Sequence, residues 1–409
     1  MTSSMVKRAV TASAAVVMVL GMAACGNKTA ASSDGEVKDL KIWDGYTQYD
    51  ENSPLGKMYS KCADQVGVKL DRTTDQKQSD TLLQNAATGN LPDMTILEYS
   101  YVPQFAKSGL LADNATTGLD ASGQLKNVIA SGEYEGKTYG ASIGFNSLAL
   151  YYDPDKLAAA GIDKAPTNWD ELREDAKKLT NGDQKGFGFS AFANEDGVHQ
   201  FLPFFWGAGA NLNKVDSKQG VEALTYMTDL IKDGSVSSDV VNWNQQDVRD
   251  QYTSGHIAMM LNGTWQLNDL DKAGAKYKVA PFPGKDGAAP VSLGGEFIEA
   301  IKTGNAARMK KAGEFMQCVI SPDGMKDWAE GQTYIIPTQS GMEDQAKSDP
   351  RLASWVESAK TAKSKVAELG ANYPNASLAL QTAVQSALSG KSSPADALAQ
   401  AQKDIDSKK

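Results

Sequence analysis

The chain has 409 residues, with 41 Lys and Arg against 50 Asp and Glu, and 41% of its residues are hydrophobic. That length corresponds to two or three domains, and the apolar fraction indicates a globular protein rather than a disordered or collagen-like one. The net charge of −9 argues against a nucleic-acid-binding surface, and two histidines with three cysteines leave little material for a zinc site or a histidine-based catalytic triad.

The first 25 residues have the pattern of an export signal. Lys7 and Arg8 precede an apolar run that is too short to span a bilayer comfortably. The run ends in small residues directly before Cys25, which resembles the lipobox of bacterial lipoproteins. We therefore predict a signal peptide at 1–24, lipidation of Cys25 and a flexible tether at 25–37. The alternative is an ordinary cleaved signal with an incidental cysteine.

The two remaining cysteines, Cys62 and Cys318, each lie among apolar residues with helical spacing. A disulfide between them is possible outside the cytoplasm, but the sequence gives no evidence that they are close. Because free cysteines are among the most buried residues, we expect two separate buried thiols.

The mature chain begins with alternating strand and helix patterns. Strands are expected at 40–43, 68–72 and 94–97, with helices that begin at Ser53-Pro54 and at Ser79 or Asp80. This order predicts a parallel sheet with right-handed crossovers. Ligands of such sheets bind beyond the carboxyl ends of the strands, so the loops after Trp43 and Leu97 should border one crevice.

The alternation continues through the rest of the chain. Strand patterns recur at 139–153 and 257–261, and helices are expected at 168–179, 221–231, 246–253, 306–320, 354–368 and 378–387. No repeat of 20–50 residues is visible, which argues against a solenoid or a propeller.

Five stretches carry a family resemblance. They are 91–96 (Leu-Pro-Asp-Met-Thr-Ile) with 105–111, 134–140 (Tyr-Glu-Gly-Lys-Thr-Tyr-Gly) with 150–152, 165–172 (Ala-Pro-Thr-Asn-Trp-Asp-Glu-Leu), 255–265 (Gly-His-Ile-Ala-Met-Met-Leu-Asn-Gly-Thr-Trp), and 312–315 with 321–324 and 335–338. In this order and behind a lipobox, they resemble the carbohydrate-type solute-binding proteins of bacterial ABC importers, close to the maltose-binding cluster.

The resemblance implies an α/β fold with two lobes, each a mostly parallel sheet flanked by helices, joined by two or three hinge crossovers. The first lobe would comprise 38–144 and 292–334, and the second 145–291 and 335–409. Crossovers are expected near 142–146, 290–295 and 334–337. A ligand closes such hinges only through contacts that are better in the closed form.

A sugar presents apolar C–H faces and a belt of hydroxyls, so its site should combine Trp and Tyr with Asp, Glu and Asn. Trp265 is the strongest candidate, because it follows a strand end and matches the family's Asn-Gly-x-Trp, whose tryptophan stacks on sugar. The other candidates are Trp43, Tyr46, Glu98, Tyr99, Tyr101, Asn146, Trp206, Glu296 and Tyr334. Asn146 matches a position where the maltose-binding pattern has a carboxylate. That pattern has an aromatic residue and an aspartate where this chain has Leu97 and Ser100, which makes a maltose ligand doubtful.

Each of these residues also has a purely structural interpretation, and we assign Trp169, Trp328 and Trp355 to packing. His199 and His256 are isolated in the sequence, so we expect structural roles for both.

We therefore expect a monomeric, lipid-anchored receptor on the extracytoplasmic face of the membrane. It would capture a mono- or oligosaccharide and deliver it to the permease of an ABC importer, without chemistry, cofactor or metal. One alternative is a secreted carbohydrate-active enzyme, although no pair of carboxylates stands out as a glycosidase would require. The other is a binding protein for a non-sugar solute such as a polyol phosphate or a peptide.

Overall fold

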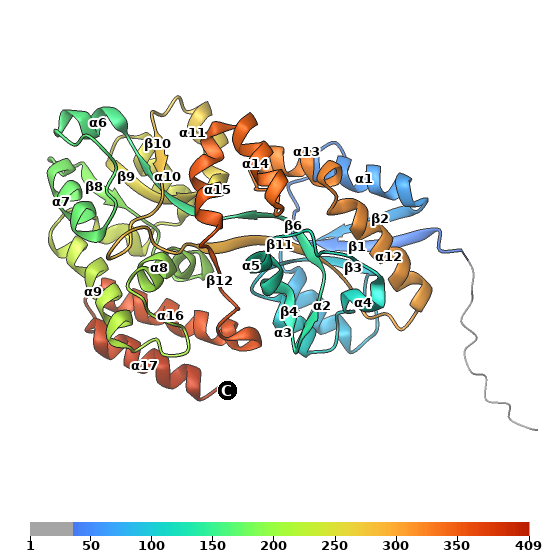
Figure 1. Ribbon diagram of the computed structural model, residues 1–409. Helices are drawn as coiled ribbons and strands as arrows, with labels where there is room; N and C mark the ends of the chain where they lie inside the picture. Colours follow the sequence, from blue (N-terminus) through green and yellow to red (C-terminus); the bar gives the residue numbers. More distant parts are fainter. Residues whose placement is uncertain (1–35, 409) are drawn as a thin grey trace, which may run out of the picture. The chain divides into compact units, whose positions relative to one another are not determined.

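Two large β-sheets organise residues 36–408, the part of the chain that the computed structural model describes (Figure 1). We call the region around the six-stranded sheet the first lobe and the region around the four-stranded sheet the second lobe. The predicted signal peptide at 1–24, the lipidation site Cys25 and most of the tether lie outside the described residues. Within that part of the chain, no helix is both long enough and apolar enough to cross a membrane.

The sheet of the first lobe has the strand order β12-β11-β3-β1-β2, with β6 also paired to β11. Its strands are β1 (Asp39–Asp44), β2 (Lys69–Thr74), β3 (Met94–Glu98), β6 (Ala141–Asn146), β11 (Ser292–Ala300) and β12 (Lys363–Ser364). The pairings of β1 with β2 and with β3 are parallel, as the strand and helix order predicts. β11 runs antiparallel to both β3 and β6.

Helices pack around this sheet, and their ends follow local chemistry. They are α1 (Pro54–Val66), α2 (Gln78–Ala86), α3 (Val102–Lys107), α4 (Asn114–Thr117), α5 (Lys126–Ile129), α12 (Ala306–Val319) and α13 (Pro322–Gln332). α1 begins where the Ser53 hydroxyl accepts a hydrogen bond from the Gly56 amide at 3.1 Å. It ends at Gly67, whose φ of 70° is a left-handed conformation that suits glycine. The expected cap of α2 is wrong, because Lys77 occupies that position without a side-chain hydrogen bond.

The sheet of the second lobe has the order β10-β7-β9-β8. Its strands are β7 (Leu148–Tyr152), β8 (Lys185–Gly188), β9 (Ile257–Gly263) and β10 (Lys278–Ala280). Only β8 and β9 pair parallel, whereas β7 runs antiparallel to β9 and β10. The expectation of a mostly parallel sheet therefore fails in this lobe. β7 follows β6 after Ser147 alone, so no helix reverses the chain before it enters the second sheet.

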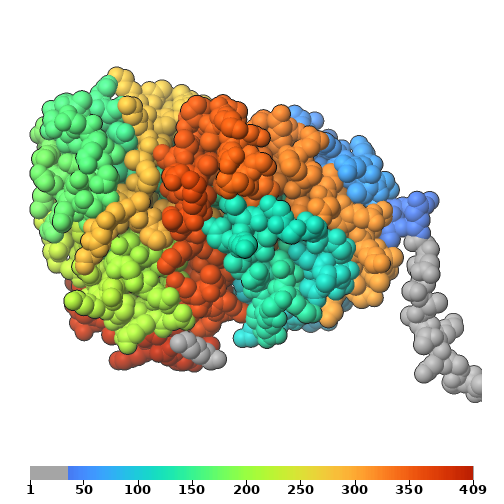
Figure 2. Space-filling view, in the orientation of Figure 1, coloured from blue at the N-terminus to red at the C-terminus, as the bar shows by residue number. Residues whose placement is uncertain are grey.

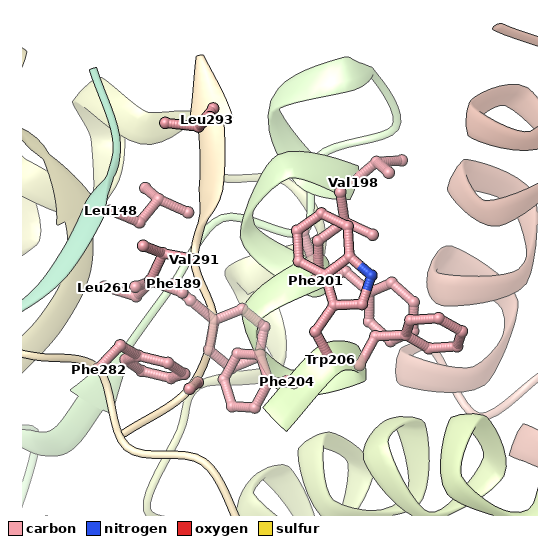
Figure 3. Packing of buried hydrophobic residues seen from close by; sticks show 14 of the residues in the cluster. Leu148, Phe189, Val198, Phe201, Phe204, Trp206, Leu261, Phe282, Val291 and Leu293 are labelled. Carbon is pink, nitrogen blue, oxygen red and sulfur yellow. The ribbon is translucent and has the colours of Figure 1, made fainter. Parts of the chain in front are cut away.

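The second lobe is helix-rich, and one of its helices is almost entirely buried. The helices are α6 (Pro154–Ala159), α7 (Trp169–Leu179), α8 (Glu195–Gly207), α9 (Lys218–Lys232), α10 (Gln245–Thr253), α11 (Leu267–Lys272), α16 (Tyr373–Leu388) and α17 (Pro394–Asp406). Figure 3 shows Phe201, Phe204 and Trp206 of α8 among the core residues around Phe282 and Val291. The Phe204 and Phe282 rings meet edge-on, with centroids 4.9 Å apart.

The chain passes between the lobes at several points, the first of them one residue beyond the expected range 142–146. β6 pairs in the first sheet and β7 in the second, so the first passage is at Ser147. The second passage brings the chain back into β11. At the third, Phe145 and Ile335 exchange backbone hydrogen bonds of 2.9 and 2.8 Å. Residues 36–409 form one compact unit, so the lobes pack closely and their predicted limits stay a prediction.

The tail departs from the predicted helix at 354–368. α15 (Ala353–Ala359) ends early, and the chain then adds β12 to the start of β11. This parallel pairing with a distant strand overrides the local helical pattern. Before that break, Trp355 donates a hydrogen bond to the Ser147 carbonyl at 3.1 Å, next to the second sheet.

Residues 359–372, which we call the strap, cross the junction between the lobes. The Asn127 side chain of the first lobe donates hydrogen bonds to the carbonyls of Ala359 and Ala362 at 2.9 and 3.0 Å. The strap then leads directly into α16 of the second lobe. In the space-filling view, the orange-red part of the chain fills the boundary between the two lobes (Figure 2).

Cys62 and Cys318 form a disulfide, so the expectation of two separate thiols is wrong. The cysteines are 256 positions apart in the sequence, but α1 packs against α12 and brings their Cα atoms to 5.6 Å. Spacing alone cannot reveal such a long-range contact. The crosslink fastens two helices of the first lobe.

Replacing both cysteines with serine (Cys62→Ser with Cys318→Ser) should destabilise the first lobe by about 2–5 kcal/mol, because the crosslink restricts the unfolded chain. Thermal unfolding followed by circular dichroism measures this change. Wild-type protein treated with reductant under mild denaturation serves as the control and should approach the variant. An unchanged Tm in the double variant would contradict the prediction.

Candidate functional site

The candidate site lies where the carboxyl ends of β1 and β3 meet β11. Tyr46 follows β1, Glu98 ends β3, and Glu296 is the cross-strand partner of Glu98. A cavity of about 200 Å³ opens here, and these three side chains line it together with Gln78 and Tyr101. The position agrees with the general rule for ligands of α/β sheets. Larger surface pockets lie elsewhere on the described chain, but none of the ten candidate residues lines these pockets.

The Glu296 carboxyl is largely buried but has few hydrogen-bond partners. Its Oε1 accepts a hydrogen bond from the Tyr334 hydroxyl at 3.4 Å, whereas its Oε2 is buried without a partner among the described residues. The buried Tyr46 hydroxyl lies close to this carboxyl but forms no hydrogen bond of ordinary geometry among the described residues. Burial raises the pKa of Glu296 to about 7, the Glu98 charge adds to this, and the nearby tyrosine hydroxyls oppose it. The site therefore holds a carboxyl that can accept or donate hydrogen bonds near neutral pH.

Asn146 and Trp265 extend this cluster toward the second lobe. Asn146 ends β6, and a Cβ at Gly294 would collide with its Oδ1, so the glycine lets the amide lie against β11. Trp265 lies in the short helix η3 (Thr264–Gln266) at the end of β9, with its ring centroid 6.2 Å from that of His199. Its indole nitrogen is buried without a partner in the described chain.

The Asn-Gly-x-Trp motif has a packing reason as well. The Trp265 ring folds back over Gly263, where any Cβ would collide with it. The loop is held to the first lobe because the Thr333 hydroxyl donates to the Thr264 carbonyl at 2.6 Å. The Thr264 hydroxyl itself has no partner within residues 36–408. The motif thus fixes an aromatic ring at the boundary of the lobes.

An ionic cluster that sequence reasoning missed lies beside Glu98. The ammonium of Lys365 on the strap is 2.7 Å from Glu98 Oε1 and 3.0 Å from Glu195 Oε1 at the start of α8. Lys365 is only 4% exposed. Burial opposes its charge, but the two carboxylates outweigh this effect and raise the pKa of Lys365. No sequence signal identified Lys365, because its partners are 267 and 170 positions away.

The two histidines have different surroundings. His199 is buried and its Nδ1 hydrogen-bonds the Ser292 hydroxyl, while burial and the Lys365 charge hold its pKa well below the usual range. Its ring lies beside that of Trp265. His256 is exposed, where its ring nitrogen lies 3.2 Å from the Ser254 hydroxyl. These surroundings agree with the structural roles expected for both.

Four predicted residues lie apart from the cluster centre. Tyr99 is 2% exposed, its hydroxyl pairs with the Ser142 hydroxyl at 2.5 Å, and its ring packs edge-on to another core ring. Trp206 lies in the core of the second lobe (Figure 3). Trp43 is half-buried on β1 and does not line the cavity, while Tyr101 is 39% exposed at the cavity rim. Burial therefore gives Tyr99 and Trp206 packing roles and leaves Tyr101 free to reach a ligand.

Glu299 is a second buried carboxyl on β11, but it differs from Glu296. Both of its oxygens lack partners among the described residues, and it lines none of the described cavities. Burial raises the pKa of Glu299 well above its ordinary value. We do not include it in the site.

Comparison with known proteins agrees with this geometry. The model of the bacterial extracellular solute-binding protein family matches residues 55–354. The chain belongs to this family. A binding protein of Brucella abortus is 24% identical over 275 residues, which cover 63% of this chain and 66% of that protein. The match thus spans just under two thirds of that relative's length.

Two further proteins extend the comparison. A maltooligosaccharide ABC transporter solute-binding lipoprotein of Streptococcus pneumoniae is 28% identical over 325 residues, covering 71% of each chain. The crystal structure of a cyclic alpha-maltosyl-1,6-maltose binding protein from Arthrobacter globiformis superposes with a TM-score of 0.78 at 22% identity, covering 91% of this chain and 99% of that one. The structural likeness establishes the two-lobed fold.

Replacing Glu296 with glutamine should change how stability depends on pH. Its pKa rises from 4.5 to about 7 on folding, so the folded protein keeps a proton that the unfolded chain loses between these values. The free energy of unfolding should therefore fall across this window by up to about 3 kcal/mol more in the wild type than in Glu296→Gln.

Urea unfolding at a series of pH values measures this difference. Glu330→Gln, at an exposed position on α13, is the matched control and should follow the wild type. Parallel pH profiles of wild type and Glu296→Gln would show that the carboxyl titrates normally.

Proposed function

We propose that this chain captures a mono- or oligosaccharide in the junction between its lobes and delivers it to the permease of an ABC importer. The observation that carries the proposal is a pair of neighbouring buried polar groups in one cavity, the Tyr46 hydroxyl and Glu296 Oε2, neither of which has a hydrogen bond of ordinary geometry among the described residues. A buried polar group without a partner is costly, and the hydroxyls of a sugar supply both donors and acceptors. The Trp265 ring offers the flat apolar surface that a sugar face requires.

The departure from the maltose-binding pattern has a physical consequence. Where the family has an aspartate, the Ser100 amide donates a hydrogen bond of 2.8 Å to Glu98 Oε2. Glu98, two residues earlier, then supplies the carboxylate of this loop. We infer a shifted contact set, made by Tyr46, Glu98 and Glu296. The described relatives that bind maltooligosaccharides support the carbohydrate class but do not fix the sugar.

The remaining features belong to the same proposal. The chain acts as a monomer outside the cell, held at the membrane by lipid on Cys25. The family's extracellular placement supports this location. The lobes close on the sugar, and the closed complex is the form that the permease receives.

A carbohydrate-active enzyme is the second candidate, and one observation favours it. Glu98 and Glu296 share the cavity, and one of them has a raised pKa, as in glycosidase pairs. Against this, Glu98 is engaged by Lys365 at 2.7 Å and offers only part of its carboxylate. We therefore propose binding without chemistry.

Trp265→Ala should weaken sugar binding at least about tenfold, because a stacked ring in a buried contact contributes roughly 1–3 kcal/mol. Titration calorimetry against a panel of glucose, maltose, maltotriose and unrelated disaccharides measures the affinity. Trp265→Phe keeps a flat ring and should retain most of it. A folded Trp265→Ala protein with wild-type affinity would remove this residue from the site.

Prolonged incubation with the same oligosaccharides should return them intact, as a receptor without chemistry requires. Anion-exchange chromatography of the solution detects any product. Hydrolysis that disappears in Glu296→Gln would establish the enzyme instead. Absence of binding to every member of the panel would contradict the carbohydrate class.

A further inference from the structure

Lys365 joins three parts of the molecule that are far apart in the sequence. It lies on the strap, Glu98 ends a strand of the first lobe, and Glu195 begins a helix of the second. The salt-bridge distances are 2.7 and 3.0 Å, and the lysine is 4% exposed. The ammonium therefore bridges the two lobes in a buried place where each contact is strengthened by the exclusion of water.

Each carboxylate is held firmly on its own side. Glu98 accepts hydrogen bonds from the amide and the hydroxyl of Ser100 in the first lobe. Glu195 accepts from the Tyr373 hydroxyl at 2.7 Å and from the Ser377 hydroxyl, both on α16 of the second lobe. The carboxylates therefore move with their lobes, and within residues 36–408 the Lys365 side chain connects them.

The strap itself is fastened to the first lobe just before Lys365. Ser364 shares a hydrogen bond of 2.7 Å with the Ser131 hydroxyl, and β12 pairs with β11. The strap is also fastened to the second lobe after Lys365, where Glu368 accepts a hydrogen bond from the Leu212 amide. If the lobes separate, Lys365 cannot keep both carboxylates, and its place beside β12 favours Glu98 over Glu195. The Lys365 ammonium therefore contacts two carboxylates when the lobes are together and one when they are apart. Such a difference in contacts is what shifts the balance between two states of a hinge.

We propose that Lys365 is a positioning residue that couples closure of the lobes to the placement of Glu98 in the cavity. The strap restrains opening of the lobes through the salt bridge between Lys365 and Glu195 of the second lobe. For its effect on sugar release, this inference rests on the proposed function. The restraint on the lobes does not depend on what the ligand is.

The test measures the distance between the lobes in the mature chain without ligand, with Cys25→Ser so that the dyes react only with the introduced cysteines. Dyes are attached through Gln84→Cys on α2 and Lys178→Cys on α7, both exposed, while the native disulfide stays oxidised. Single-molecule energy transfer should show a compact population that is lost in Lys365→Met and restored in Lys365→Arg. Lys360→Met, whose ammonium makes a more exposed pair with Glu357, is the matched control and should behave as the wild type.

A wild-type distance distribution in Lys365→Met, or an equal shift in Lys360→Met, would overturn the proposal. If Lys365→Met does not fold, Glu195→Gln is measured in its place. This variant removes the salt bridge to the second lobe and leaves the Lys365 contact with Glu98. It should then show the same loss of the compact population, and an unchanged distribution would overturn the proposal.

A second readout separates positioning from mere stability. The dissociation rate of the sugar that binds most tightly in the calorimetry panel, measured by stopped-flow tryptophan fluorescence, should rise at least about tenfold in Lys365→Met with little change in the association rate. A lower Tm with an unchanged dissociation rate would mean a purely structural lysine. If the distances shift but no carbohydrate binds the wild type, the proposed function fails and the restraint stands.

Discussion

A carboxyl group buried without enough hydrogen-bond donors is the constraint on which the site depends. Glu296 sits on β11, the strand that pairs with β3, β6 and β12 and so connects most of the first sheet. Its neighbours Tyr46 and Tyr334 bring hydroxyls close, yet one carboxyl oxygen and one hydroxyl stay unsatisfied among the described residues. Glu296 cannot move to find other hydrogen-bond donors, because β11 is paired with strands on both of its edges. A hydroxylated ligand is the simplest group that removes it.

The lobes contribute unequal chemistry to the junction. The first lobe supplies Tyr46, Glu98 and Glu296, which are hydrogen-bonding groups around the cavity. The second lobe supplies Trp265, whose aromatic ring fits in the space left by the missing side chain of Gly263. A sugar needs both kinds of contact at once, and it gains both only when the lobes are together. The strap then adds a contact between the lobes that is independent of the sugar.

Much of the fold could be predicted from the sequence, because its signals are local. Caps such as Ser53 in the first lobe and Asn168 in the second, together with the helical and strand periodicities, place many of the elements. The family resemblance implied crossovers near 142–146 and 334–337, and the chain changes sheets close to the first of these, at Ser147. The antiparallel direction of β7 and the early end of α15 could not be predicted, because both depend on pairing with distant strands.

The site could be predicted only in part, for the same reason. Tyr46, Glu98, Glu296 and Tyr334 lie together in the structure, although the sequence placed the first two after strands and the last two at expected crossovers. Burial sends Tyr99 and Trp206 into the core, and no sequence pattern distinguishes a core tyrosine from one that faces a ligand. Lys365 and the Cys62–Cys318 disulfide are contacts between residues more than 150 positions apart, which only the folded chain reveals.

Native mass spectrometry of the mature chain, mixed with a pool of mono- and oligosaccharides, tests the central claim most directly. The account predicts that the wild type retains one intact carbohydrate and that the double variant Tyr46→Phe with Glu296→Gln retains none. Equal retention by both proteins, or no retained sugar in the wild type, would contradict it.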